Sequence, residues 1–164
     1  DRLIAPRAEG EIAFILKKDL TGPGVTNADV LAATECVMPC FEIVDSRVRD
    51  WKIKIEDTVA DNASAGLFVV GDDHADPREL DLGACEMEMT TDGKVVSQGT
   101  GAAALGSPLV CVAWLANAMA ASGVGLRQGD VILSGSLGAV VPAIPGTTMD
   151  VSITGIGHAS VRFS

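Results

Sequence analysis

Apolar runs in the first half of the chain predict strands. Residues 8–16 become continuously apolar after two glutamates, which is typical of a strand that enters the protein interior. The charged residues at 17–19 return the chain to solvent. Two shorter apolar runs, at 41–44 and 66–70, predict further strands.

The chain between these two short runs is more polar. Across residues 45–57, the apolar residues Trp51, Ile53 and Ile55 alternate with charges, so we expect a surface ribbon or a lid. The small polar residues at 58–65 predict a loop.

Two helices are predicted from their start signals. Thr26 followed by Asp29 resembles a capping box, and the apolar residues after it predict a helix that continues until Pro39. Ser107 and Pro108 suit the N-cap and the first position of a second, apolar helix that stops near the glycines that follow it.

The second half of the chain predicts short strands and tight turns. Residues 85–90 alternate between apolar and polar, and Asp92-Gly93 after them is typical of a hairpin turn. No internal repeat and no Pro/Gly linker divides the chain, so we predict one mainly β domain with two helices over residues 1–164.

Composition then narrows the class of protein. The chain has 164 residues, with 12 Lys and Arg against 22 Asp and Glu, and a formal net charge of −10. Proteins that bind nucleic acid neutralise phosphates with clustered basic residues, so we expect no nucleic-acid partner. Hydrophobic residues make up 48% and charged residues 21%, which is typical of a globular domain.

Membrane insertion and secretion are not indicated. The longest mainly apolar stretch, 109–121, is too short to span a bilayer and predicts a buried helix. The chain begins without Met and without a charged-then-apolar leader, so we expect a fragment with no secretory signal.

The four cysteines sit in apolar runs and form no CxxC motif. This usage predicts packed, reduced thiols in a cytoplasmic protein. A zinc pair at Cys36 and Cys40 would need further ligands, whereas His74 and His158 lie far apart in the sequence.

Two glutamates in the first predicted strand form the strongest candidate site. Glu9 and Glu11 are two residues apart, so on a strand both carboxylates point to one face and repel each other. Ala13 and Ile15 continue that face into the interior, so a cation would resolve the repulsion. Glu42 on the second strand is the candidate third ligand, and three carboxylates favour Mg²⁺ or Mn²⁺ over zinc.

A second pair of glutamates with the same spacing limits this inference. Glu86 and Glu88 alternate with Cys85, Met87 and Met89 beside the hairpin turn, which is typical of an amphipathic strand whose glutamates face water. We assign that pair no function. Spacing alone therefore does not establish a metal site at the first pair.

Four sequence segments, and their order along the chain, support a metal site at Glu9 and Glu11. The chain contains AEGEIAFIL at 8–16, FEIVDSR at 41–47, DTVADNASAG at 57–66 and ILSGSLG at 132–138. In combination they resemble the 2-keto-4-pentenoate (2-hydroxypenta-2,4-dienoate) hydratases of bacterial aromatic meta-cleavage pathways, within the fumarylacetoacetate hydrolase superfamily. The similarity runs from about residue 5 to the end of the chain.

The resemblance implies an α+β fold, a mainly β, mixed-sheet roll of the fumarylacetoacetate hydrolase C-terminal domain type with two main helices. It implies that Mg²⁺ or Mn²⁺ is bound by Glu9, Glu11 and Glu42. It also implies an activity, the addition of water to 2-hydroxypenta-2,4-dienoate to give 4-hydroxy-2-oxopentanoate.

The resemblance also implies residues around the substrate. It places the ADNAS loop beside the pocket, so Asp61, Asn62 and Ser64 become candidate catalytic residues, and Ser64 also becomes a candidate substrate contact. Ser136 matches a position with a small hydroxyl near the substrate carboxylate. Each has a structural alternative, because Asp, Asn and Ser also close turns on their own backbone.

Family chains have an additional N-terminal portion that contributes a lysine and an aspartate to the pocket. We expect that portion to be absent here, and its roles are not transferred to Lys52 or Lys54. The nearest alternative activity is 4-oxalocrotonate decarboxylation on the same metal scaffold, and hydrolysis of an acylpyruvate is more distant. A third alternative is a non-catalytic partner subunit, because the resemblance implies homo-oligomers and association with a decarboxylase.

Overall fold

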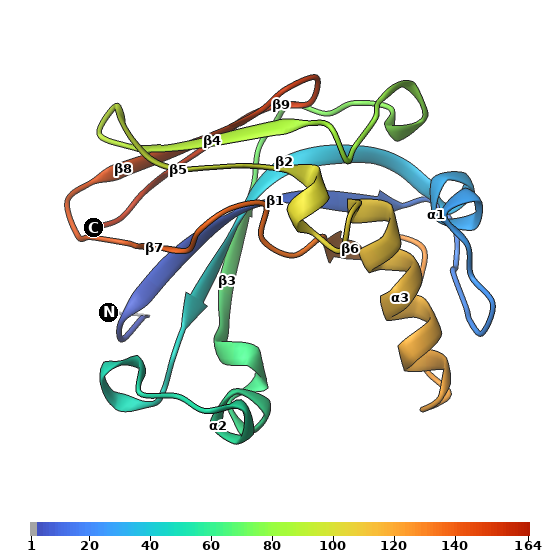
Figure 1. Cartoon of the computed structure of the whole chain (residues 1–164), viewed down its shortest axis with the longest axis horizontal. Helices are drawn as coiled ribbons and strands as arrows, with labels where there is room; N and C mark the ends of the chain where they lie inside the picture. The colour runs from blue at the N-terminus through green and yellow to red at the C-terminus, as the bar shows by residue number, and fades with distance from the viewer. Residues whose placement is uncertain (1–2) are drawn as a thin grey trace.

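The computed structural model describes residues 3–164, which form two stacked β-sheets (Figure 1). The strand order is β3-β2-β1-β6 in the first sheet, where β7 also pairs with β1, and β5-β4-β8-β9 in the second. The first sheet contains β1 (Pro6–Leu16), β2 (Thr34–Asp45), β3 (Ala65–Val70), β6 (Val131–Leu133) and β7 (Val141–Pro142). The second contains β4 (Glu86–Thr91), β5 (Lys94–Thr100), β8 (Thr148–Ile153) and β9 (Gly157–Arg162).

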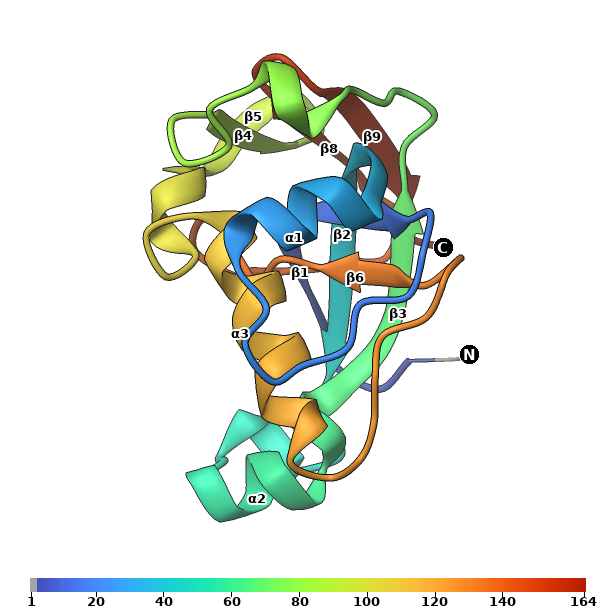
Figure 2. The same cartoon turned by 90° about the vertical axis from the view of Figure 1, so that its right-hand side faces the viewer.

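The α3 helix lies on the side of the first sheet away from the second sheet, α1 packs against α3, and α2 lies beyond the ends of β2 and β3 (Figures 1 and 2). The helices are α1 (Asn27–Ala33), α2 (Ile55–Ala60) and α3 (Pro108–Ala120), and the 3-10 turns are η1 (Arg49–Trp51), η2 (Asn62–Ser64), η3 (Pro77–Glu79) and η4 (Gly101–Ala103). The predicted α+β, mainly β fold is confirmed. All the named strands pair antiparallel, including the non-consecutive pairs β1–β6, β1–β7 and β4–β8.

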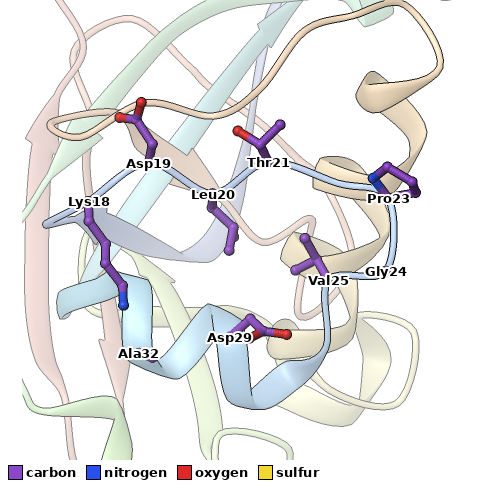
Figure 3. A pocket seen from close by; sticks show the side chains of 9 residues that line it. All are labelled: Lys18, Asp19, Leu20, Thr21, Pro23, Gly24, Val25, Asp29 and Ala32. Carbon is purple, nitrogen blue, oxygen red and sulfur yellow. The ribbon is translucent and has the colours of Figure 1, made fainter.

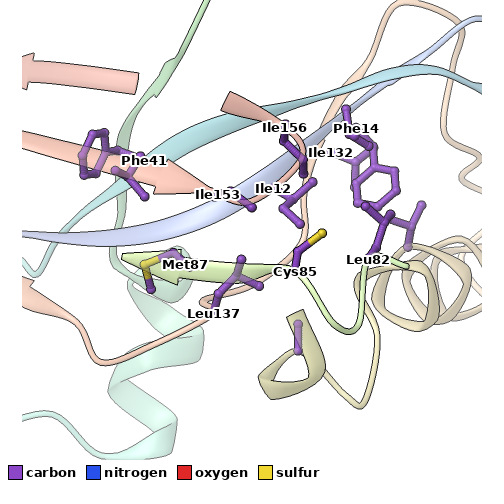
Figure 4. Packing of buried hydrophobic residues seen from close by; sticks show 14 of the residues in the cluster. Ile12, Phe14, Phe41, Leu82, Cys85, Met87, Ile132, Leu137, Ile153 and Ile156 are labelled. Carbon is purple, nitrogen blue, oxygen red and sulfur yellow. The ribbon is translucent and has the colours of Figure 1, made fainter. Parts of the chain in front are cut away.

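The hydrophobic core fills the space between the two sheets, where Figure 4 shows side chains from both meeting, and it extends to buried residues of α1 and α3. On β1, Ile12 and Phe14 are fully buried in it. Gly10 lies on the same face, where an added Cβ would lie 3.0 Å from Val151 Cγ2 and 3.1 Å from Met87 Sδ. Because side chains alternate along a strand, the opposite face of β1 is left for other residues.

The first predicted helix is shorter than expected. It begins at the Thr26–Asp29 capping box, as predicted. It ends before Thr34 and not at Pro39, because β2 pairs with β1 from Thr34 to Asp45. Pairing with a long buried strand outweighs the local helix signal, and the short strand predicted next is the second half of β2.

The segments predicted as a ribbon and a loop are helical instead. Residues 45–57 contain η1 and the start of α2, and residues 58–65 contain the rest of α2 and η2. The Lys54 N–H donates to Asp57 Oδ2 at 2.9 Å, and this capping contact starts a helical turn. Ile55 is 72% exposed, so the predicted surface location is confirmed.

The predicted hairpin and second helix are confirmed. Asp92 and Gly93 have φ angles of 47° and 76°, as a primed turn requires, and α3 begins at Pro108. Residues 101–120 contain an 18-residue window with a mean hydropathy of 1.5, the length and apolarity of a membrane span. They are divided into η4, a turn and the 13-residue α3, which is short of the about 20 helical residues that cross a bilayer.

Candidate metal centre

The β1–β2 register brings three carboxylates together on the face of the first sheet that is turned away from the core. Glu9 on β1 lies directly opposite Glu42 on β2, and Glu11 follows on the same face of β1. One oxygen from each carboxylate lies within 4.8 Å of the other two. The structure therefore gathers the three residues predicted as metal ligands into one cluster.

Burial makes this cluster unfavourable without a counter-charge. Glu11 is fully buried, and desolvation together with the charge of Glu42 raises its pKa to about 9. One hydrogen bond opposes that shift, because the Gly135 N–H donates to Glu11 Oε2 at 2.7 Å. Desolvation and Glu42 also raise the pKa of Glu9. A bound cation would allow all three groups to be ionised together.

The donor set fits a hard divalent cation. Glu11 Oε1 is buried and has no hydrogen-bond partner. Within residues 3–164, none of the ion pairs involves the three glutamates. A bound cation would provide the missing partner for this buried carboxylate oxygen and would balance the charge of the two neighbouring carboxylates. Oxygen ligands favour Mg²⁺ or Mn²⁺.

Two thiols neighbour Glu11. Cys40 is its cross-strand partner, and Cys111 belongs to α3. Burial, followed by the charge of Glu11, raises the pKa of both thiols, so they remain protonated and are poor metal ligands. All four cysteines are free, as predicted. Cys36 and Cys40 are four strand residues apart, about 13 Å, which is too far to share one zinc ion.

The ILSGSLG segment closes one side of the cluster through its backbone. Gly135 has a φ of 86°, a left-handed conformation that suits glycine and that accompanies its N–H contact with Glu11. Ser134 accepts from the Ile12 N–H at 3.1 Å and ties the segment to β1. The Ser136 hydroxyl donates to the Gly138 carbonyl at 2.8 Å. Sequence reasoning selected Ser136 and missed the Gly135 amide, which side-chain chemistry does not reveal.

The ADNAS segment forms a strained turn at the start of β3. Asn62, Ala63 and Ser64 have φ angles of 52°, 55° and 57°. Left-handed conformations cost about 1–2 kcal/mol for each residue other than glycine, so neighbouring contacts must hold this turn. Ser64 is buried, whereas Asn62 is exposed.

Asp61 is the acceptor that organises this turn. Its Oδ2 accepts from Ser64 Oγ at 2.8 Å, and its Oδ1 pairs with Arg47 Nε at 2.7 Å. Partial desolvation is outweighed by the hydrogen bonds from Ser64 and Arg47, so the pKa of Asp61 is lowered. Sequence reasoning missed Arg47, although FEIVDSR contains it.

The 61–64 turn lies next to the strand positions just beyond Glu42. Ala65 is the register partner of Val44, which lies two residues beyond Glu42 on the same face of β2. Two residues along a strand correspond to about 7 Å. The strand pair that carries Glu42 therefore ends at the ADNAS turn.

Two hollows are lined by residues other than the three glutamates. One has a volume of about 960 Å³ and is lined by residues that include Leu3, Phe68 and Phe163. The other, about 360 Å³, lies between the Lys18–Val25 loop and α1 (Figure 3). None of the predicted site residues lines either hollow.

Taken together, the fold and the cluster define an α+β domain with a candidate divalent-cation site. The chain belongs to the family described as "Fumarylacetoacetate (FAA) hydrolase C-terminal", whose profile matches residues 3–164.

The chain is also similar to individual proteins of this group. It is 60% identical over 162 residues to 2-hydroxyhexa-2,4-dienoate hydratase of Comamonas testosteroni, covering 99% of the chain and 61% of the relative. It is 69% identical over 124 residues to 2-hydroxypent-2,4-dienoate hydratase of Pseudomonas putida, covering 76% of the chain and 56% of the relative.

A solved structure has the same fold. The 4-oxalocrotonate decarboxylase from Pseudomonas putida G7, complexed with magnesium and adipate, matches with a TM-score of 0.93 and 41% identity, covering 99% of the chain and 62% of that protein. The chain thus spans about three fifths of the length of these relatives.

Proposed function

We propose that the chain is the metal-binding catalytic domain of a hydro-lyase that adds water to 2-hydroxypenta-2,4-dienoate and forms 4-hydroxy-2-oxopentanoate. The observation that carries the proposal is the cluster of Glu9, Glu11 and Glu42, in which Glu11 is fully buried and the other two are half-buried. Its support is that the relatives at 60% and 69% identity are named as dienoate hydratases.

Glu9, Glu11 and Glu42 would hold Mg²⁺ or Mn²⁺, and the magnesium in the related decarboxylase supports a divalent ion. When bound, the ion supplies Lewis-acid stabilisation of the negative charge that develops on the C2 oxygen of the substrate. The Gly135 amide orients Glu11 by donating to its second oxygen.

The reaction needs groups that orient substrate and water and that move protons. The dienol ketonises as its hydroxyl proton is lost and C5 gains a proton. Water oxygen then bonds to C4 as the C3=C4 double bond is lost, water gives up one proton, and C3 gains one. We assign contacts with the substrate to Ser64 and Ser136, and orientation of water to the exposed Asn62. The Ser64 and Ser136 hydroxyls already donate to Asp61 and to the Gly138 carbonyl, so they would accept hydrogen bonds from the substrate hydroxyl or from water. Asp61 has a lowered pKa, so at neutral pH it accepts hydrogen bonds and holds the turn.

Location and assembly are part of the same proposal. A cytoplasmic homo-oligomer that associates with a decarboxylase would fit a domain with free cysteines and exposed apolar side chains on an edge strand, such as Phe68, which is 52% exposed. The whole protein, and not this chain alone, would carry the activity.

A second candidate function is 4-oxalocrotonate decarboxylation, favoured by the TM-score of 0.93 to a decarboxylase. The hydratase ranks first because identity to the hydratases is higher than the 41% to the decarboxylase. A non-catalytic partner subunit is a third candidate, and it predicts that the carboxylate cluster is dispensable for turnover.

The test uses the full-length protein, with both substrates and either Mg²⁺ or Mn²⁺. We expect hydration, and we expect Glu9→Gln with Glu11→Gln to abolish it without preventing assembly. Glu86→Gln with Glu88→Gln is the matched control, because this exposed pair has the same spacing. Decarboxylation without hydration would support the second candidate, and unchanged turnover in the Glu9/Glu11 variant would support the third.

A further inference from the structure

We propose that Arg47 is a positioning residue for this reaction, one that holds the 61–64 turn and with it Ser64 at the end of the strand pair carrying Glu42. The inference rests on the proposed function. Arg47 would act through Asp61 and Ser64 and would not touch the substrate itself.

The contacts of Arg47 join three segments. Its Nε pairs with Asp61 Oδ1 at 2.7 Å, its backbone N–H donates to Asp61 Oδ2 at 3.1 Å, and its Nη2 donates to the Asp61 carbonyl at 2.9 Å. Its Nη1 donates to the carbonyls of Asp45 and Ala65, at 2.7 Å and 3.0 Å. The end of β2, the end of α2 and the start of β3 are thus held by one guanidinium.

The geometry of these acceptors requires arginine. They lie in several directions around a planar fork with five N–H donors, whereas a lysine ammonium is a single point charge on a flexible stem. Arg47→Lys therefore keeps the charge but loses part of the contact set.

The turn needs this support because its conformation is strained. Its three central residues, Asn62, Ala63 and Ser64, are all left-handed without being glycine. Arg47 fixes the Asp61 carboxylate, and that carboxylate accepts from Ser64 Oγ at 2.8 Å. Contacts run from Arg47 through Asp61 to Ser64, so a displaced Asp61 displaces a candidate substrate contact.

Arg78 provides a matched control elsewhere in the fold. It pairs with Asp76 at 2.7 Å and donates to the carbonyls of Leu31, Thr34 and Glu35. Its side chain is 39% exposed, close to the 44% of Arg47. Both arginines join separate segments, but only Arg47 contacts the 61–64 turn.

The experiment compares Arg47→Lys and Arg78→Lys in the full-length protein. For Arg47→Lys we expect kcat/KM to fall about 100-fold, because small misplacements of a positioning group have effects of that size. We expect Mg²⁺ affinity, measured by calorimetry, to change less than about twofold, since the carboxylate cluster is untouched. Amide hydrogen exchange should accelerate at residues 61–65. Arg78→Lys should keep kcat/KM within about threefold.

A double-mutant cycle separates positioning from general stability. If Arg47 acts through Ser64, Arg47→Lys should cost little further kcat/KM in a Ser64→Ala background. Additive losses, or equal losses for Arg47→Lys and Arg78→Lys, would overturn the proposal. If Arg47→Lys does not fold, Asp61→Asn should reproduce its kinetic pattern, and failure to do so would overturn it equally.

The two proposals fail in different ways. Absence of hydration by the unaltered protein would refute the proposed function, whereas the exchange result would still be measurable. Unchanged exchange at residues 61–65 in Arg47→Lys would refute the holding role of Arg47, whatever the protein catalyses.

Discussion

Removing divalent cations should make the stability of this domain fall as pH rises from 5 to 8. The cause is Glu11, whose pKa in the folded protein is raised to about 9 from an ordinary value of 4.5 by burial and by Glu42. Between pH 4.5 and about 9, the Glu11 carboxyl group is ionised in the unfolded chain and protonated in the folded protein. The unfolded state therefore binds fewer protons, and stability falls with increasing pH.

The magnitude follows from the shift. At 1.36 kcal/mol per pH unit, a shift from 4.5 to about 9 corresponds to on the order of 6 kcal/mol across the full range. Small domains are stable by only about 5–15 kcal/mol, so this loss is large. The raised pKa of Glu9 acts in the same direction. Aspartates with lowered pKa values, such as Asp61, contribute stability that is nearly complete at about pH 5 and above, so they add little slope between pH 5 and 8.

The assay is urea unfolding of the full-length protein at pH 5, 6, 7 and 8, with EDTA or with excess Mg²⁺. We expect a falling free energy of unfolding in EDTA and a stabilisation by Mg²⁺ that grows with pH. Glu11→Gln should remove most of the dependence of the unfolding free energy on pH. Glu88→Gln, at an exposed position, should leave that dependence unchanged. A flat or rising profile in EDTA, or a slope that survives Glu11→Gln, would refute the reasoning.

Three further predictions concern backbone and packing. Gly10→Ala should destabilise the protein by about 1–3 kcal/mol in urea, because its Cβ would lie within 3.1 Å of Met87 and Val151; an unchanged midpoint would contradict this. Gly135→Ala should cost about 1–2 kcal/mol because its φ is 86°, and it should weaken Mg²⁺ binding in calorimetry; tighter binding would argue against the role of its amide. Asn117→Ala should cost about 1–3 kcal/mol in thermal unfolding, since Asn117 contacts both the N–H and the carbonyl of Val25; a loss below about 0.5 kcal/mol would show that water replaces these contacts.

Elements with strong local signals could be predicted from the sequence. Alternation along a strand placed Glu9 and Glu11 on one face, and the capping box and the Asp-Gly turn located a helix start and a hairpin. Glu42 was a candidate third ligand from its place on an apolar strand, and the resemblance strengthened that prediction, because nothing local predicts the strand register that brings it opposite Glu9.

Features that depend on tertiary contacts could not be predicted. The residues after Ala33 read as helix, yet they pair with a distant strand. The Gly135 backbone amide contacts the side chain of Glu11, and the Arg47 side chain contacts the backbone carbonyl of Ala65, so each contact pairs a side chain with a backbone group of another segment. A sequence pattern describes side chains, so such contacts leave little trace in it.

The pairing of Glu9 with Glu42 also has a consequence for how the chain folds. A slip of one residue between β1 and β2 would move every side chain of one strand to the opposite face and separate these acids. Mutual repulsion penalises the native alignment until a cation arrives, so metal present during refolding would select the correct alignment. Metal supply would then affect the yield of native protein as well as its turnover.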